Sequence, residues 1–259
     1  MGHLRLGRLP KTRRWREVVE LLDAPEANSA AISAAVLHAA ERRLRGLGKD
    51  SSLSYAFWLL TKITWAARQP GFEVELRRLG FEVTDDTSIF SFISEVSGHL
   101  RRTLPPETPS GPFSELVSLA VRRALTDSIG GYGRSLFGSS VDDLRDALRT
   151  QSRQAQFGLL AQRFFGDLLA RTLAYFLDRE SASTLTARPD ASAVAANEEL
   201  MSGIDLHARQ SARIVRDYAG GWYSKYNWQT KGQITQDDTR RFVAYALRKL
   251  RSEVQREIA

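Results

Sequence analysis

Apolar residues recur at helical spacing along most of this chain, and that periodicity constrains the fold more than any other feature. Between residues 154 and 180, for example, Phe157, Leu160, Phe164 and Leu168 follow one another at intervals of three or four. Such intervals place side chains on one face of an α-helix. No stretch of four to eight residues alternates apolar and polar side chains with β-branched enrichment, the pattern of a strand. The sequence therefore predicts an all-α fold, an irregular bundle of about nine or ten helices with no significant sheet.

Local signals locate the ends of several helices. Ser140 with Asp143, and Thr235 with Asp238, have the three-residue spacing of a capping box. Ser51 or Ser52 is expected to open an apolar helix that stops at Pro70-Gly71. Further helices are expected over about residues 12–22, 27–44, 85–100, 113–129, 154–180 and 194–218, the last ending at Gly220-Gly221.

The segment 104–112 (LPPETPSGP) contains four prolines and a glycine, a composition typical of a loop. We place a lobe boundary there, with an N-terminal helical lobe over residues 1–103 and a C-terminal helical lobe over 113–259. A single continuous domain is the alternative, because 259 residues lie near the upper size of one hydrophobic core.

The composition excludes several classes of protein. The absence of cysteine rules out disulfides and cysteine-based zinc sites, and it fits a reducing compartment, which we take to be the cytoplasm. No stretch reaches the ~18 apolar residues of a membrane span, so membrane insertion is not expected. The first residues hold no long apolar segment, which argues against a secretory signal. Arginine outnumbers lysine and alanine is abundant, which we interpret as GC-rich bacterial coding.

No recognisable catalytic or metal-binding motif occurs in the chain. The four histidines are scattered, and neither Gly48-Lys49 nor Gly131-Tyr132-Gly133 completes a phosphate-binding loop. A Gly-x-Ser-x-Gly nucleophile motif is also missing. We therefore expect no catalytic residue, no metal and no cofactor. An enzyme whose active site is assembled from dispersed residues remains an alternative, since catalytic residues need not be adjacent in sequence.

Positive charge concentrates at the N-terminus. The chain has a net charge of +7, which favours polyanionic partners. Six cations precede the first acid, Glu17, and form our first candidate binding surface: Arg5, Arg8, Lys11, Arg13, Arg14 and Arg16. The alternative is a solvated tail that leads into a basic helix face.

A second candidate surface combines an aromatic segment with the last helix. The segment GGWYSKYNWQTKG, residues 220–232, interleaves rings and cations: Trp222, Tyr223, Lys225, Tyr226, Trp228 and Lys231. This mixture suits base stacking, cation–π contact or a protein interface. The alternative is that the segment is a loop whose rings plug the bundle. The helix that follows carries Arg240, Arg241, Arg248, Lys249 and Arg251 away from its apolar stripe. A solvated outer face would explain these cations equally well.

Two functional hypotheses follow from these observations. The first is a non-enzymatic helical adaptor, a subunit of a larger bacterial assembly that binds a protein partner. The second is a protein that binds nucleic acid directly without sequence specificity, for example in a DNA-processing or phage-defence system. The oligomeric state is left open by the sequence.

Overall fold

The computed structural model describes residues 13–22, 29–39, 50–104, 113–133, 140–185 and 191–256. Every regular element in these ranges is helical and none is a strand, so the all-α prediction is confirmed. The elements are α1 (Arg13–Leu22), α2 (Ser29–Ala39), α4 (Ser51–Ala66), α5 (Phe72–Arg78), α6 (Ile89–Thr103), α7 (Phe113–Ile129), the 3₁₀ helix η1 (Gly130–Gly133), α8 (Val141–Gln151), α9 (Gln154–Leu185), α10 (Ala191–Ser211), α11 (Arg213–Thr230) and α12 (Gln236–Arg256).

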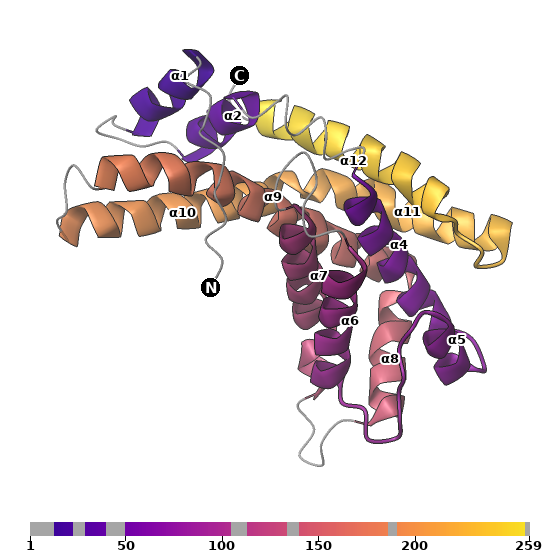
Figure 1. Ribbon diagram of the computed structural model, residues 1–259. Helices are drawn as coiled ribbons and strands as arrows, with labels where there is room; N and C mark the ends of the chain where they lie inside the picture. Colours follow the sequence, from indigo (N-terminus) through magenta and orange to yellow (C-terminus); the bar gives the residue numbers. More distant parts are fainter. Residues whose placement is uncertain are drawn as a thin grey trace.

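The long helix α9 is the central element, as its nearly all-round apolar sequence predicts. It packs against α7, α10 and α11. In Figure 1, α10 lies along one end of α9 and α11 with α12 along the other, while α4 to α8 project to one side. Helix α4 packs against α12 and α7, so elements far apart in sequence meet here. The division into two lobes stays a prediction, and most of the predicted boundary loop lies outside the described residues.

The aromatic centre of the core explains how these helices are joined. The ring of Phe57 in α4 lies 5.1 Å from the ring of Phe242 in α12 and 5.4 Å from that of Phe165 in α9. Trp222 in α11 lies 5.9 Å from the same ring. Burial of such rings is the largest single contribution that a side chain makes to core stability. Phe57 therefore connects the early and late parts of the chain.

The predicted capping boxes are present. The hydroxyl of Ser140 accepts a hydrogen bond from the Asp143 amide at 3.3 Å, and that of Thr235 accepts from the Asp238 amide at 3.2 Å. Helix α4 begins at Ser51, as expected, and Asp50 is the residue that caps it. A short aspartate side chain satisfies the exposed first-turn amides as well as serine does.

The start of α6 differs more from the sequence-based expectation. The helix begins at Ile89 and not near residues 85–86, because the Ser88 hydroxyl accepts a hydrogen bond from the Ser91 amide at 3.0 Å. This side chain satisfies an amide that would otherwise have no partner in the first turn. The cap therefore fixes the helix start a few residues later than the sequence suggested.

The single helix expected over about residues 194–218 is instead two. Helix α10 ends at Ser211 and α11 begins at Arg213. The hydroxyl of Ser211 donates to the His207 carbonyl oxygen at 2.9 Å, a bond to the fourth preceding residue that favours bending. The break at Ala212 separates α10 from α11, and both helices pack against α9.

The predicted helix end at Gly220-Gly221 is wrong, because α11 continues through both glycines to Thr230. A β-carbon at position 220 would collide with the Gln154 backbone carbonyl. Glycine is therefore present here to let α11 approach the start of α9, and not to end the helix. Helix α11 ends instead at Lys231, whose φ of 51° is left-handed.

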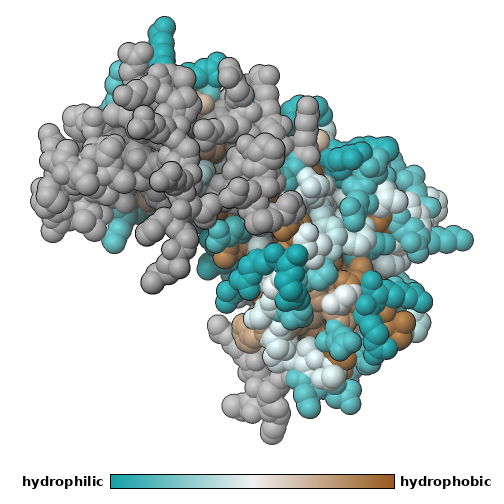
Figure 2. All heavy atoms as spheres, viewed as in Figure 1, coloured by the Kyte–Doolittle hydropathy of each residue, from teal (hydrophilic) through white to brown (hydrophobic). Residues whose placement is uncertain are grey.

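Hydrophilic residues cover much of the described surface on the face drawn in Figure 2, notably over α11 and α12. Lower in the bundle, hydrophobic side chains reach the surface between hydrophilic ones (Figure 2). Among the described helices, none combines the length and the apolar character that crossing a bilayer requires.

Candidate functional site

The N-terminal candidate surface is only partly described. Arg5, Arg8 and Lys11 lie outside the described residues, as does the side chain of Arg16. Arg13 is exposed and lies 3.6 Å from the carboxylate of Glu17. Arg14 donates a hydrogen bond to the His38 carbonyl oxygen at 3.2 Å, which connects α1 with α2. The two described arginines of this surface therefore both have a partner within the protein.

Residues 220–230 of the aromatic segment belong to α11 and not to a loop, which corrects the expectation, and only Lys231 and Gly232 lie in the turn that follows. The helical spacing sends the rings in different directions. Tyr223 is 1% exposed and stacks on Phe157 with ring centroids 3.8 Å apart. Trp222 is half-buried and stacks on Phe242 at 4.5 Å, while Tyr226 packs beside Trp222 at 5.2 Å. These three rings fill the space between helices.

The remaining members of that segment face solvent. Trp228 is 83% exposed, the largest value for any large hydrophobic side chain among the described residues. Lys225 and Lys231 are also exposed. The segment therefore divides into a buried half that stabilises the fold and an exposed half available for contact.

The cations of α12 have partners within the same helix. Arg240 lies 2.6 Å and Arg241 3.4 Å from the carboxylate of Asp237. Arg248 and Lys249 lie over the ring of Tyr245, at 5.5 and 5.8 Å from its centroid. The fifth predicted cation, Arg251, is half-buried. Exposed pairs of this kind contribute little to stability, but they reduce the positive potential of this face.

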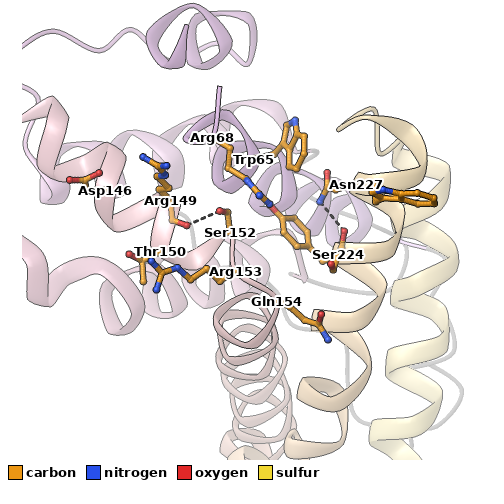
Figure 3. Close-up of a pocket in the computed structure, with 12 residues that line it drawn as sticks. Trp65, Arg68, Asp146, Arg149, Thr150, Ser152, Arg153, Gln154, Ser224 and Asn227 are labelled. Carbon is orange, nitrogen blue, oxygen red and sulfur yellow. Dashed lines mark hydrogen bonds between the residues drawn. The ribbon is translucent and has the colours of Figure 1, made fainter. Parts of the chain in front are cut away.

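Three arginines that have no ion pair among the described residues lie elsewhere, in a cleft of about 940 Å³ between α4, the junction of α8 with α9, and α11. Figure 3 shows arginines reaching into this cleft from more than one wall. The cleft is lined by Trp65, Arg68, Asp146, Arg149, Thr150, Ser152, Arg153, Gln154, Tyr223, Ser224, Asn227 and Trp228. We call it the arginine cleft.

The first wall is formed by the end of α4 and the turn that follows it. Arg68 lies over the ring of Trp65, 5.2 Å from its centroid, in a cation–π contact. Helix α4 ends at Ala66, four residues before the Pro70-Gly71 stop that the sequence predicted, so Arg68 lies in the turn that follows the helix. Trp65 packs against Gly232, where a β-carbon would collide with its indole ring.

Two further side chains of α4 hold the α11–α12 turn in place. The Lys62 ammonium donates to the Gly232 carbonyl oxygen at 2.9 Å, and the Trp58 indole NH donates to the Ile234 carbonyl oxygen at 3.0 Å. Partial burial lowers the pKa of Lys62, while the nearby carboxylate of Glu75 counteracts that shift. The turn is thereby fixed against α4, and this positions Trp228 next to the arginine cleft.

The second wall is the junction between α8 and α9. The Ser152 hydroxyl donates to the Arg149 carbonyl oxygen at 2.6 Å, and the Arg153 amide donates to that of Thr150 at 3.2 Å (Figure 3). These bonds end α8 while leaving the side chains of Arg149 and Arg153 exposed. The junction therefore presents two guanidinium groups to the cleft.

The third wall is α11, where Tyr223 and Asn227 form the buried floor. The Tyr223 hydroxyl lies 3.2 Å from the Thr64 hydroxyl, and the side-chain amide of Asn227 donates to the Tyr223 carbonyl oxygen at 2.9 Å. Burial raises the pKa of Tyr223 to about 12. The phenol is therefore protonated at neutral pH and is unsuited to act as a base.

The electrostatics of the arginine cleft are one-sided. Three arginines line it against one acid, Asp146. Within the described part of the chain, no ion pair involves Arg68, Arg149 or Arg153. Guanidinium groups stay charged at any physiological pH and donate planar, forked hydrogen bonds that match phosphate and carboxylate oxygens. The cleft is therefore suited to hold an anion with several such oxygens.

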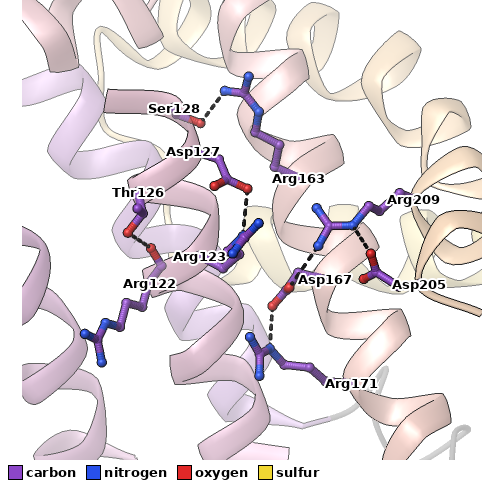
Figure 4. Close-up of polar contacts among 10 residues, drawn as sticks. All are labelled: Arg122, Arg123, Thr126, Asp127, Ser128, Arg163, Asp167, Arg171, Asp205 and Arg209. Atoms are coloured by element: carbon purple, nitrogen blue, oxygen red, sulfur yellow. Dashed lines mark hydrogen bonds and ion pairs between the residues drawn. The ribbon is translucent and has the colours of Figure 1, made fainter. Parts of the chain in front are cut away.

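The ion cluster between α9 and α10 provides a contrast. Asp167 is buried, accepts from Arg171 at 2.5 Å and lies 3.6 Å from Arg209, which also pairs with Asp205 at 2.7 Å (Figure 4). Burial raises the pKa of Asp167, and the neighbouring arginines counteract that shift. Arg123, which also borders this hollow of about 370 Å³, pairs with Asp127. Each of these guanidinium groups has a carboxylate partner, and the pair between Arg209 and Asp167 joins α10 to α9.

Of the residues that line the arginine cleft, only Tyr223 and Trp228 were predicted from the sequence. Arg68, Arg149 and Arg153 were not predicted, and they come from two separate parts of the chain. A usable signal existed for two of them, because Arg149 and Arg153 lie at a helix end and no acidic residue occurs between Asp146 and Asp167. Arg68 carries no such signal, since only the tertiary packing of α4 brings it here.

No group of three or more histidine, aspartate or glutamate side chains in the described ranges is arranged to hold a metal ion. No protein-family model, no curated protein and no solved structure matches this chain.

Proposed function

We propose that this protein is a non-enzymatic nucleic-acid-binding protein that holds a phosphate backbone in the arginine cleft. The observation that carries the proposal is the presence of three arginines without a carboxylate partner among the described residues, grouped around one hollow of about 940 Å³. Leaving three charges unpaired in one place raises their mutual repulsion, which an anionic ligand would relieve. A polyanion with regularly spaced charges fits this arrangement.

The chemistry of the lining favours a backbone ligand over a specific sequence. Arginine contacts to phosphate oxygens position a strand but carry no information about its bases. Seryl, threonyl and amide side chains supplement the guanidinium groups at Thr150, Gln154 and Ser224. The net charge of +7 would increase the association rate of a polyanion at low salt.

The proposal is tested by fluorescence anisotropy with a strand of about six nucleotides, short enough to occupy one site. Three phosphate contacts predict that log Kobs falls with log salt concentration with a slope of about −2, since each contact to a single strand contributes about −0.7. Replacing Arg68, Arg149 or Arg153 with alanine should each reduce the magnitude of the slope by about 0.7.

Arg122→Ala is the matched control, because this exposed arginine of α7 points away from the ion cluster and does not line the arginine cleft (Figure 4). It removes the same charge from the protein. If Arg122→Ala reduced the slope as much as the cleft variants did, general charge and not the cleft would account for binding. Absence of binding at ~50 mM salt and micromolar protein would refute the proposal, because counterion release favours complexes most at low salt.

The adaptor hypothesis is the second candidate, and exposed rings outside the arginine cleft support it. Phe90 in α6 is 50% exposed and Tyr132 in η1 is 48% exposed. The Phe90 ring lies over Gly130, so both rings belong to the same end of the bundle. Exposed aromatic side chains are enriched at protein interfaces. Pull-down of the native protein should recover a partner that Phe90→Ser together with Tyr132→Ser releases; a monomer that co-purifies with nothing would contradict it.

A further inference from the structure

We infer that the arginine cleft takes single-stranded nucleic acid, with one unpaired base stacked on the indole ring of Trp228. This inference rests on the proposed function, because it assumes that the three arginines hold phosphates. It adds the class of nucleic acid and the residue that selects it.

The exposure of Trp228 is the first observation. Its side chain is 83% exposed, whereas Trp222 of the same helix is half-buried against Phe242. In the described part of the chain, no ring stacks on Trp228 and no hydrogen bond involves its indole. A large apolar ring left in water is unfavourable, because burying apolar surface is favoured. A ligand that covers the ring would recover that free energy.

The position of Trp228 relative to the charges is the second observation. The indole lines the same hollow as Arg68, Arg149 and Arg153, next to the buried floor of Tyr223 and Asn227. An aromatic platform beside a track of cations is how proteins bind single strands without sequence preference, because every base offers a planar face. The base would lie on the ring while its flanking phosphates reach the guanidinium groups.

The size of the cleft argues against a double helix. A volume of about 940 Å³ lies within the range of ~300–1,000 Å³ typical of sites for drug-sized molecules. Such a hollow admits a few nucleotides and not a section of duplex. In a duplex, moreover, base faces are covered by their neighbours, so stacking on Trp228 would require a base to leave the helix.

The platform is also held in place. Lys62 and Trp58 of α4 bind the carbonyl oxygens of Gly232 and Ile234, just beyond the end of α11. The Asn227 side chain bonds to the Tyr223 carbonyl one turn earlier. The backbone that carries Trp228 is therefore fixed before a ligand arrives, which reduces the ordering that binding requires.

The test compares three ligands of equal length by anisotropy: an oligothymidylate, the same strand without bases, and a blunt duplex. We expect the wild-type protein to bind oligothymidylate roughly tenfold more tightly than the abasic strand, the contribution of one stacked base. Trp228→Ala should remove that difference and leave the affinity for the abasic strand unchanged. Trp228→Phe should keep part of the difference, and the quenching of tryptophan fluorescence by oligothymidylate should be smaller in Trp228→Ala than in the wild-type protein, because Trp65 also lines the cleft.

Phe90→Ala is the matched control, because it removes another exposed ring without touching the arginine cleft. It should leave all three affinities unchanged. Equal affinity of the wild-type protein for the strands with and without bases would overturn the inference while leaving phosphate binding intact. Tightest binding to the duplex, or full competition by thymidine monophosphate at the same concentration, would overturn it as well. If neither single strand binds at all, the proposed function fails and the inference with it.

Discussion

Gly220 and Gly221 are adjacent in α11, yet alanine should have opposite effects at the two positions. A β-carbon at position 221 would meet nothing within 4 Å, whereas one at position 220 would collide with the backbone carbonyl of Gln154. Alanine inside a helix is more stable than glycine by about 0.5–1 kcal/mol, because it restricts the unfolded chain more. Gly221→Ala should therefore increase the free energy of unfolding by about that amount.

Gly220→Ala gains the same propensity but must separate α11 from the start of α9. Overpacking of this kind costs about 1–3 kcal/mol, and the obstacle here is backbone, which cannot rotate away as a side chain can. Because both variants share the propensity gain, they should differ in the free energy of unfolding by the overpacking cost alone, about 2 kcal/mol.

Urea unfolding followed by the helical circular dichroism signal measures this difference. With a denaturant slope of about 2–3 kcal/mol per molar, as expected for a chain of this size, 2 kcal/mol separates the two midpoints by about 0.7–1 M. A Gly220→Ala protein as stable as Gly221→Ala would refute the close approach of α11 to α9. It would also remove the physical reason given for a helix that continues through two glycines.

Two other substitutions test the cap of α12 and the environment of His99. Asp238→Ala removes both bonds that its carboxylate accepts from Thr235 and should lower the free energy of unfolding by about 1 kcal/mol, measured by urea unfolding against the exposed Gln229→Ala; equal stability of the two would contradict the capping role. Burial, and then the charge of Arg102, lowers the pKa of His99, while Glu95 counteracts the shift. As pH falls through 6.5, the unfolded chain takes up this proton before the folded protein does, so stability should decline until the lower folded pKa is passed. His99→Gln should flatten this part of the stability profile, and an unchanged profile would show that other groups cause it.

Much of the fold follows from local sequence signals because these signals act locally. The boxes at Ser140 and Thr235 fix two helix starts by bonds within four residues. The apolar face of α4 predicted a buried helix, and Leu53, Phe57 and Leu60 are fully buried. In each case the residues that determine the outcome are neighbours along the chain.

The errors in the aromatic segment and at its two glycines arise where a distant segment decides the outcome. Gly220 looks like a helix end in sequence, and only the approach of α9 explains why glycine is needed inside α11. Tyr223 and Trp228 have the same aromatic character, but helical geometry buries one against Phe157 and exposes the other.

The candidate site was predicted least well for the same reason. Arg68 lies about eighty residues before Arg149 in the chain, and the two become neighbours only when α4 packs beside the α8–α9 junction. Conversely, the basic pattern of α12 suggested a binding face, but sequence alone did not show that Asp237 would pair with both Arg240 and Arg241. A count of cations cannot separate paired from unpaired charge.

The most direct measurement is ultraviolet cross-linking of a short single strand to the whole protein, with the attached peptides mapped by mass spectrometry. If the strand lies in the arginine cleft, the main cross-link should fall on Trp228 and a secondary one on Trp65. Replacing Arg149 or Arg153 with alanine should reduce the cross-linking yield. Cross-links confined to residues 236–256 of α12, or to the first sixteen residues of the chain, would contradict the central claim. They would assign binding to the basic surfaces that the sequence suggested and not to the cleft.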